Sequence, residues 1–86
     1  MPDENAPISW LALEEGTPIL AADGSEIGRV LEVVADEQKD IFSGVVFRPG
    51  LLDGRRFIPA AAIDRLTKSA VHLNISPEEA GKLGGY

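Results

Sequence analysis

The sequence predicts an all-β domain, a small antiparallel sandwich or barrel that ends in a short C-terminal helix. Five or six short segments rich in β-branched and aromatic residues recur about every ten residues, which is typical of small all-β folds. Turn-forming residues separate these segments, and two of the turns are Asp-Gly pairs. Closure into a barrel would also remove strand edges that so small a sheet could not otherwise protect.

The length of 86 residues suits one domain, which we divide into a flexible tail (1–7), a β domain (8–75) and a short helix with its tail (76–86). The chain has no cysteine, which excludes disulfides and thiolate chemistry. Its acidic N-terminus does not resemble a secretory signal, and no apolar run is long enough to span a bilayer. We therefore expect a soluble cytoplasmic protein.

The first apolar segment, residues 8–13, contains the only tryptophan. We expect this segment to dock on the core as a short strand or turn that ends before Gly16. Trp10 fits two roles there, because a large aromatic side chain near a terminus can cover the core or take part in a subunit contact.

Residues 21–36 could form a hairpin, or a loop that opens a helix. Four apolar residues have the i, i+3, i+4, i+7 spacing of an amphipathic helix: Ile27, Val30, Leu31 and Val34. However, β-branched residues fit a pleated sheet better, and Asp23-Gly24 is a strong signal for a two-residue type I′ turn. We predict the hairpin, with a β-bulge where the alternation breaks at Leu31-Glu32.

The same stretch does not support a phosphate-binding loop. Gly24 and Gly28 match neither the dinucleotide-binding pattern nor the P-loop pattern, and Glu26 would repel an anion. The acids of residues 36–40 lack the order of an EF-hand calcium loop, so we expect a charged turn there.

Residues 41–48 are the clearest central strand, because they are apolar on both faces. Gly44 marks a bulge or a close approach of the backbone within this strand, and Pro49-Gly50 ends it. A second turn at Asp53-Gly54 then leads into a strand over residues 55–58.

After Pro59 we expect a helical turn at residues 60–62, a strand at 63–66, a turn at 67–69 and a strand at 70–75. The alternation of that last strand points its apolar residues inward and points His72 and Asn74 outward. A helix follows, with Ser76, Pro77 and Glu79 as its capping box, and Gly84-Gly85 ends it.

Together these residues resemble the PRC-barrel domain, a family named after the cytoplasmic domain of the photosynthetic reaction centre H subunit. The resemblance covers residues 14–75 and depends on these positions: Gly16-Thr17-Pro18-Ile19, Asp23-Gly24, Ile27-Gly28-Arg29-Val30, Val33-Val34, the central strand, and Phe57-Ile58-Pro59 before Ile63. It implies a six-stranded, partly open β-barrel that acts through protein contacts, with no family-wide catalytic residues.

The family also includes the C-terminal domain of a ribosome-maturation factor and small stand-alone bacterial proteins whose role is unassigned. The chain resembles those stand-alone members at three further positions: Trp10-Leu11, residues 40–44, and Ser76-Pro77-Glu78-Glu79. The reaction-centre membrane helix and the N-terminal RNA-processing domain have no counterpart in the sequence, so the resemblance does not imply those two roles.

Catalysis and metal binding find little support in the sequence. The only histidine, His72, is on the outward face of a strand, and the serines fit caps, turns and strands better than a triad. One histidine without cysteine leaves only carboxylates as further zinc ligands. Paired carboxylates exist, but an acidic chain is expected to have them as surface charge. We expect no enzyme, no catalytic residue, no metal and no cofactor.

The charge pattern indicates which kinds of partner the protein could bind. The net charge of −6 opposes general binding to nucleic acids, yet residues 41–75 are locally basic. Arg55 and Arg56 would point to opposite faces of a strand. We expect a self-associating protein-interaction module, a homodimer with an unidentified partner, whose contact residues are Trp10, Phe42, Arg48, Arg55, Arg56 and Phe57.

Two alternatives stay open. The first is a ribosome- or RNA-associated factor that uses a basic patch of Arg48, Arg55, Arg56, Arg65 and Lys68. The second, weaker alternative is a small-ligand or enzymatic site at the open end of the barrel.

Overall fold

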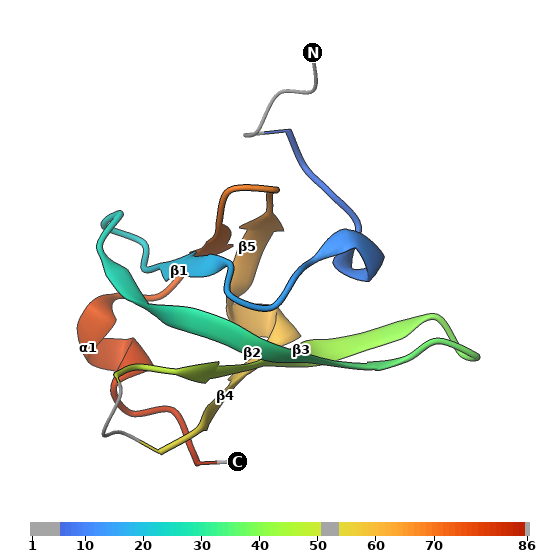
Figure 1. The fold of residues 1–86 in the computed structure, drawn as a ribbon. Helices are drawn as coiled ribbons and strands as arrows, with labels where there is room; N and C mark the ends of the chain where they lie inside the picture. Colours follow the sequence, from blue (N-terminus) through green and yellow to red (C-terminus); the bar gives the residue numbers. More distant parts are fainter. Residues whose placement is uncertain (1–5, 51–53, 86) are drawn as a thin grey trace.

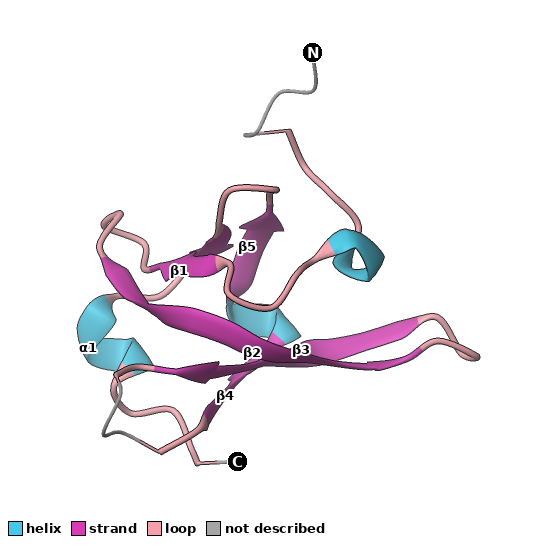
Figure 2. Ribbon diagram, in the orientation of Figure 1, coloured by secondary structure: helices cyan, strands magenta, loops and turns pink. Residues whose placement is uncertain are grey.

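The computed structural model describes residues 6–50 and 54–85 (Figure 1). Its elements, in chain order, are η1 (Trp10–Ala12), β1 (Pro18–Leu20), β2 (Glu26–Asp36), β3 (Ile41–Arg48), β4 (Arg56–Pro59), η2 (Ala60–Ala62), β5 (Ile63–Leu66), β6 (Val71–Leu73) and α1 (Pro77–Ala80). Strands therefore dominate, with one short helix near the C-terminus (Figure 2).

The six strands form one sheet in the order β4-β3-β2-β1-β6-β5. The predicted all-β class, the six strands and the partly open barrel are confirmed. One detail differs: β1 and β6 run parallel, so the sheet is mixed and not purely antiparallel. The reason is topological, because the chain crosses from β4 at one edge to β5 at the other and returns through β6 in the direction of β1.

The sheet curls because its two edge strands are neighbours in the chain. Only the three residues of η2 join β4 to β5. Each edge is also covered by a segment near one end of the described chain: the Ile8 N–H donates to the Leu66 carbonyl, and the Phe57 N–H donates to the Gly84 carbonyl. These bonds occupy edge groups that could otherwise pair with another chain.

The core lies on the concave side of this curl. Its most buried members come from five different strands: Ile19, Val30, Val45, Phe47, Ile58 and Val71. Val46 is equally buried but is not part of this cluster. Since neighbouring strand residues point to opposite faces, Val46 must point to the convex side of the sheet.

The segment 26–36 is a strand, so the hairpin prediction is confirmed and the helix alternative is excluded. Its turn is not of type I′. Gly24 has φ +89°, but Asp23 does not have a positive φ, and the Gly24 N–H donates to the Ala21 carbonyl. The Asp23 carboxylate instead accepts from the N–H and the hydroxyl of Ser25, and these bonds lower its pKa.

Two irregularities bend the β2–β3 pair. Val30 pairs with Phe47 and Glu32 with Val46, which leaves Leu31 as the predicted bulge. The register shifts again near Gly44, which adopts φ +155°. A Cβ atom on Gly44 would collide with the Ile58 carbonyl oxygen and the Phe57 ring. The predicted bulge and the predicted close approach of the backbone are therefore both present at this glycine.

Most local predictions for the C-terminal half are confirmed: η2, β5, the turn after it, the inward placement of Val71 and Leu73, and the capping box at Ser76. The helix is shorter than predicted, because Gly81 caps it, and Gly84-Gly85 runs beside β4 instead. The tail at residues 1–5 and most of the Asp53-Gly54 turn lie outside the described residues. Within the described part of the chain, no helix is long and apolar enough to cross a membrane.

Candidate protein-interaction surface

The six predicted contact residues fall into three places. Trp10 and Phe42 lie together on the concave side of the β2–β3 hairpin. Arg48, Arg55 and Phe57 belong to the convex face of strands β2, β3 and β4. Arg56 points to the opposite side and donates to the Gly81 carbonyl. The predicted opposition of Arg55 and Arg56 thus follows the alternation of a strand.

The outer half of the β2–β3 hairpin, residues 33–43, projects from the barrel, and we call it the arm (Figure 1). It projects because β4 pairs only with the stretch Gly44 to Phe47 of β3. The arm is therefore a ribbon of two strands, which is marginally stable on its own and needs a covering surface.

One face of the arm is covered by η1. The rings of Trp10 and Phe42 stack at a centroid distance of 6.1 Å, with an interplanar angle of 9°. Ser9 fixes the start of η1, since its hydroxyl accepts from the Leu11 N–H. Trp10 thus packs on the core, which is one of the two roles that the sequence allowed, and it lies at the margin of the arm.

The most exposed apolar side chains also lie here. Among the described residues, Leu11 (65 % exposed) and Ile41 (50 %) are the two large exposed hydrophobics. Each is the chain neighbour of one member of the stacked pair. Neither residue is among the six contact residues predicted from the sequence, although Ile41 directly follows the charged turn, a signal that could have pointed to it.

The other face of the arm continues into the convex face of the barrel. Val46 lies in its middle, with Glu32 opposite it on β2 and Phe57 opposite it on β4. The guanidinium of Arg55 is 3.3 Å from the Glu32 carboxylate. This ion pair joins groups on either side of β3, so it crosses the strand near Val46.

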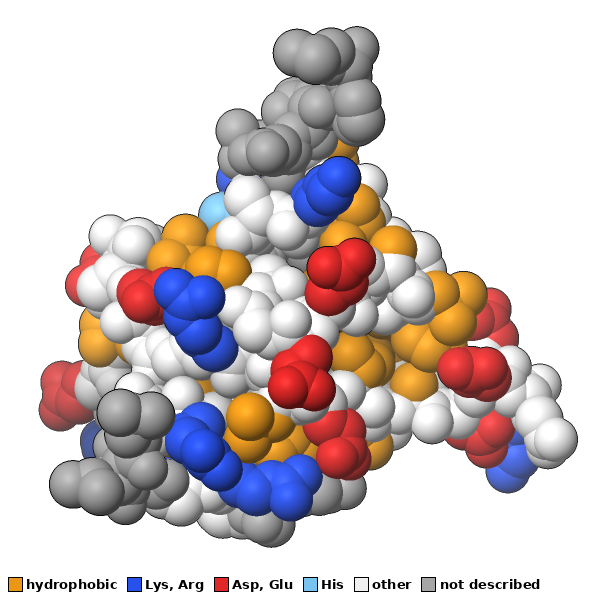
Figure 3. All heavy atoms as spheres, in the orientation of Figure 1, with side chains coloured by type: hydrophobic (Ala, Val, Ile, Leu, Met, Phe, Trp, Pro, Cys, Tyr) orange, Lys and Arg blue, Asp and Glu red, His pale blue; other side chains and the backbone are white. Residues whose placement is uncertain are grey.

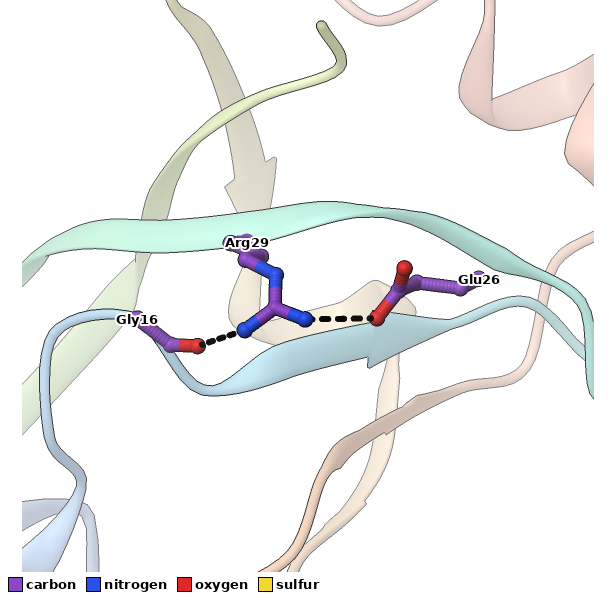
Figure 4. Close-up of polar contacts among 3 residues, drawn as sticks. All are labelled: Gly16, Glu26 and Arg29. Carbon is purple, nitrogen blue, oxygen red and sulfur yellow. Dashed lines mark hydrogen bonds and ion pairs between the residues drawn. The ribbon is translucent and has the colours of Figure 1, made fainter.

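Two arginines face each other at the base of the convex face. Arg29 and Arg48 are direct cross-strand partners. Arg29 is 3.6 Å from the Glu26 carboxylate and donates to the Gly16 carbonyl at 3.2 Å (Figure 4). Arg48 forms no ion pair with any described residue. Like charges directly opposite each other destabilise a sheet, so this arrangement has an electrostatic cost that the described residues do not offset for Arg48.

Two shallow hollows flank the arginines. One of about 250 Å³ lies beside Arg56 and is lined by Ile27, Phe47, Pro49 and Pro77. The other, of about 310 Å³, lies along Arg29, Arg48 and Leu31. No group of three or more histidine, aspartate or glutamate side chains that could hold a metal is found within residues 6–50 and 54–85.

His72 is less exposed than the predicted outward position suggested. Its ring is half-buried, and its Nε2 atom is buried without a hydrogen-bond partner in the described structure. Burial lowers the pKa of His72 below its usual value, the nearby Arg65 lowers it further, and Asp64 partly opposes them. The neutral imidazole is therefore the form that the fold favours.

This pKa shift predicts a pH-dependent stability. The unfolded chain binds a proton at His72 at a higher pH than the folded chain does, so stability falls as the pH decreases through the unfolded value. We expect the melting temperature to decrease between about pH 7.5 and about pH 5.5, and to decrease less in His72→Gln. Thermal unfolding of both proteins at these two pH values is the measurement. Equal decreases would contradict the assignment, because His72 is the only histidine.

Comparison with known proteins adds one finding. A family model described as the PRC-barrel domain matches residues 15–80. A search of curated proteins gave no significant match.

Proposed function

The chain belongs to the PRC-barrel family, and from this premise we propose that it is a non-enzymatic interaction module that associates with a second copy of itself. The observation that carries the proposal is the arm. It projects from the barrel, and the two large exposed hydrophobics, Leu11 and Ile41, lie beside the stacked aromatic pair. Apolar groups that gather on a projecting element are typical of a protein contact surface.

We place this module in the cytoplasm and assign it no cofactor and no catalytic group. The charge distribution supports protein contacts over general polyanion binding. The arginines on the described surface alternate with carboxylates, as at Arg29–Glu26 and Arg55–Glu32. Figure 3 shows the same mixture, with acidic and basic side chains interspersed around small apolar areas.

The test is the solution mass at micromolar protein. We expect light scattering to give twice the mass of one chain, because burial of the apolar arm between two copies removes it from water. Ile41→Glu should lower the mass towards that of a monomer. Ala61→Glu is the matched control, since Ala61 is also exposed and apolar but belongs to η2. A wild-type chain that stays monomeric at every concentration would contradict self-association.

The facing pair Arg29 and Arg48 is the observation that favours the second candidate, an RNA-associated factor. The full basic set is divided, however, because Arg56 points to the other side of the sheet from Arg48, and Arg65 and Lys68 lie on β5 and the turn after it. RNA binding at low salt that weakens with salt and with Arg48→Ala would support this candidate.

A further inference from the structure

We infer that two copies pair through their convex faces, in antiparallel orientation, so that the arginines of each copy meet the acidic tip of the other copy's arm. The inference rests on the proposed self-association and specifies its surface and geometry. It concerns the face that carries Glu32, Val46, Arg48 and Phe57, which we call the convex face.

The first step is that the convex face of the arm is uncovered. The concave face of the arm carries η1, through the contact of Trp10 with Phe42. Figure 1 shows no described helix or strand over the opposite side of the arm. At the outer end of the arm, Asp36 pairs with Ile41, and the next pair along the strands is Ala35 with Phe42, which faces inward. Because successive residues of a strand point to opposite faces, Asp36 and Ile41 belong to the convex side.

The second step is the apolar content of this face. Val34, Val46 and Phe57 share it with Ile41, as their pairing positions show. Ile41 is half exposed and Phe57 is partly exposed. Val46 itself is already fully buried, and the Arg55–Glu32 ion pair crosses the strand near it. The apolar surface that a second copy can remove from water therefore comprises Ile41 and the exposed parts of Val34 and Phe57, and we call these residues the apolar strip.

The third step is the separation of charge along this strip. Arg48 and Arg55 lie at the barrel end, on the side where β4 begins. At the tip of the arm, Asp36 belongs to the convex side and Asp40 lies in the turn beside Lys39, whereas Glu37 lines the hollow beside Trp10 and Leu11 on the concave side. Figure 3 shows acidic side chains on the projecting end and basic side chains beside an apolar area of the barrel, with further acidic side chains elsewhere on the same face.

A twofold axis between two copies brings the basic end of each copy opposite the acidic end of the other. An antiparallel arrangement centred near Val34 and Val46 puts the barrel end of one copy against the arm tip of the other, and does so twice. The same surface then serves both copies, as an isologous contact requires. Such an arrangement also gives Arg48, which has no ion pair among the described residues, a carboxylate partner that offsets its opposition to Arg29.

Charge reversal tests this geometry. Arg48→Glu reverses the barrel end, and its new carboxylate can pair with Arg29, so the fold should tolerate it. The tip variant, Asp36→Lys with Asp40→Asn, reverses the charge at the other end; asparagine is used because Asp40 has φ +54°, which asparagine tolerates. In either variant alone, like charges face each other. We expect self-association at least about tenfold weaker than in the wild type.

The decisive sample is an equimolar mixture of the two variants. In a mixed pair, one contact joins two reversed ends and the other joins two wild-type ends, so both contacts are attractive. We expect light scattering to show monomers for each variant alone and the doubled mass for the mixture. Arg65→Glu is the matched control, because it makes the same charge change on an exposed residue of β5 and should leave the mass doubled.

The outcomes separate the two proposals. A wild-type dimer whose mass survives in both variants overturns this geometry and leaves self-association standing. A wild-type dimer that is lost in both variants but not recovered in the mixture also overturns it. A monomeric wild type contradicts the proposed function and this inference together. Circular dichroism of each variant shows whether the chain is folded, and any unfolded variant is replaced by Arg48→Gln or by Asp36→Asn with Asp40→Asn, each of which should weaken the dimer more mildly.

Discussion

Gly44→Ala is expected to leave the protein only marginally stable at ambient temperature. A Cβ atom at this position collides with the Ile58 carbonyl oxygen and lies 2.7 Å from Cζ of Phe57. The backbone also has φ +155°, which L-residues rarely adopt. Steric overlap and backbone strain together should lower the free energy of unfolding by about 3 kcal/mol or more. A domain of this size has only about 5 kcal/mol to lose if it lies near the lower end of ordinary stability.

Three other glycines separate the two causes. Gly24 has φ +89° with open space around it, so Gly24→Ala should reveal conformational strain alone, about 1 kcal/mol. Gly28 has no such φ, but its Cβ would lie 2.6 Å from the Arg48 carbonyl oxygen, so Gly28→Ala should reveal overlap, about 1–3 kcal/mol. Gly54 has neither constraint and serves as the control.

Urea unfolding of the four variants is the measurement. We expect the midpoint to fall in the order Gly54→Ala, Gly24→Ala, Gly28→Ala, Gly44→Ala, with the first close to the wild type. If Gly44→Ala were as stable as Gly54→Ala, the close approach of β3 and β4 at Gly44 would be wrong.

Phe47→Ala should have the second large effect. Phe47 is 1 % exposed, and it lies in the middle of the core between its cross-strand partners Val30 and Arg56. Truncation removes buried apolar surface and leaves a cavity, so we expect a loss of about 3–5 kcal/mol. The thermal midpoint and the urea midpoint should both fall steeply.

Phe42→Ala is the matched control, because it deletes the same side chain from the same strand. Phe42 is only partly buried and lies on the arm, where the surroundings can relax or admit water. We therefore expect Phe42→Ala to cost clearly less than Phe47→Ala. Equal losses in the two variants would mean that the arm is as tightly packed as the barrel, contrary to the described burial.

The fold was predictable from local chemistry where backbone constraints are strong. Gly44, the Leu31 bulge and the Ser76 capping box each follow from the residue type at a defined position, and the structure contains all three. The competing helical spacing of Ile27, Val30, Leu31 and Val34 was outweighed by β-branching and by the turn at Gly24.

Other features depend on partners that are remote in the chain, and the sequence could not show them. The parallel pairing of β1 with β6 arises only when the whole sheet curls. The short α1 ends at Gly81 because the following residues run beside β4 instead of extending the helix.

The candidate surface was only partly predictable for the same reason. Trp10 and Phe42 are far apart in sequence, and they stack only because η1 packs on the concave face of the arm in the folded chain. The pairing of Arg55 with Glu32 and the opposition of Arg48 to Arg29 are set by the β2–β3 register, which the two bulges shift.

The parallel contact between Ile19 and Val71 has one more consequence. In the described sheet, the antiparallel strands β1 to β4 are hydrogen-bonded to the hairpin of β5 and β6 only through this β1–β6 pairing. Each part supplies residues to the same core, so neither encloses a complete interior by itself. The domain is consequently one cooperative unit, and a fragment that ends before β6 would lack the strand that pairs with the free edge of β1.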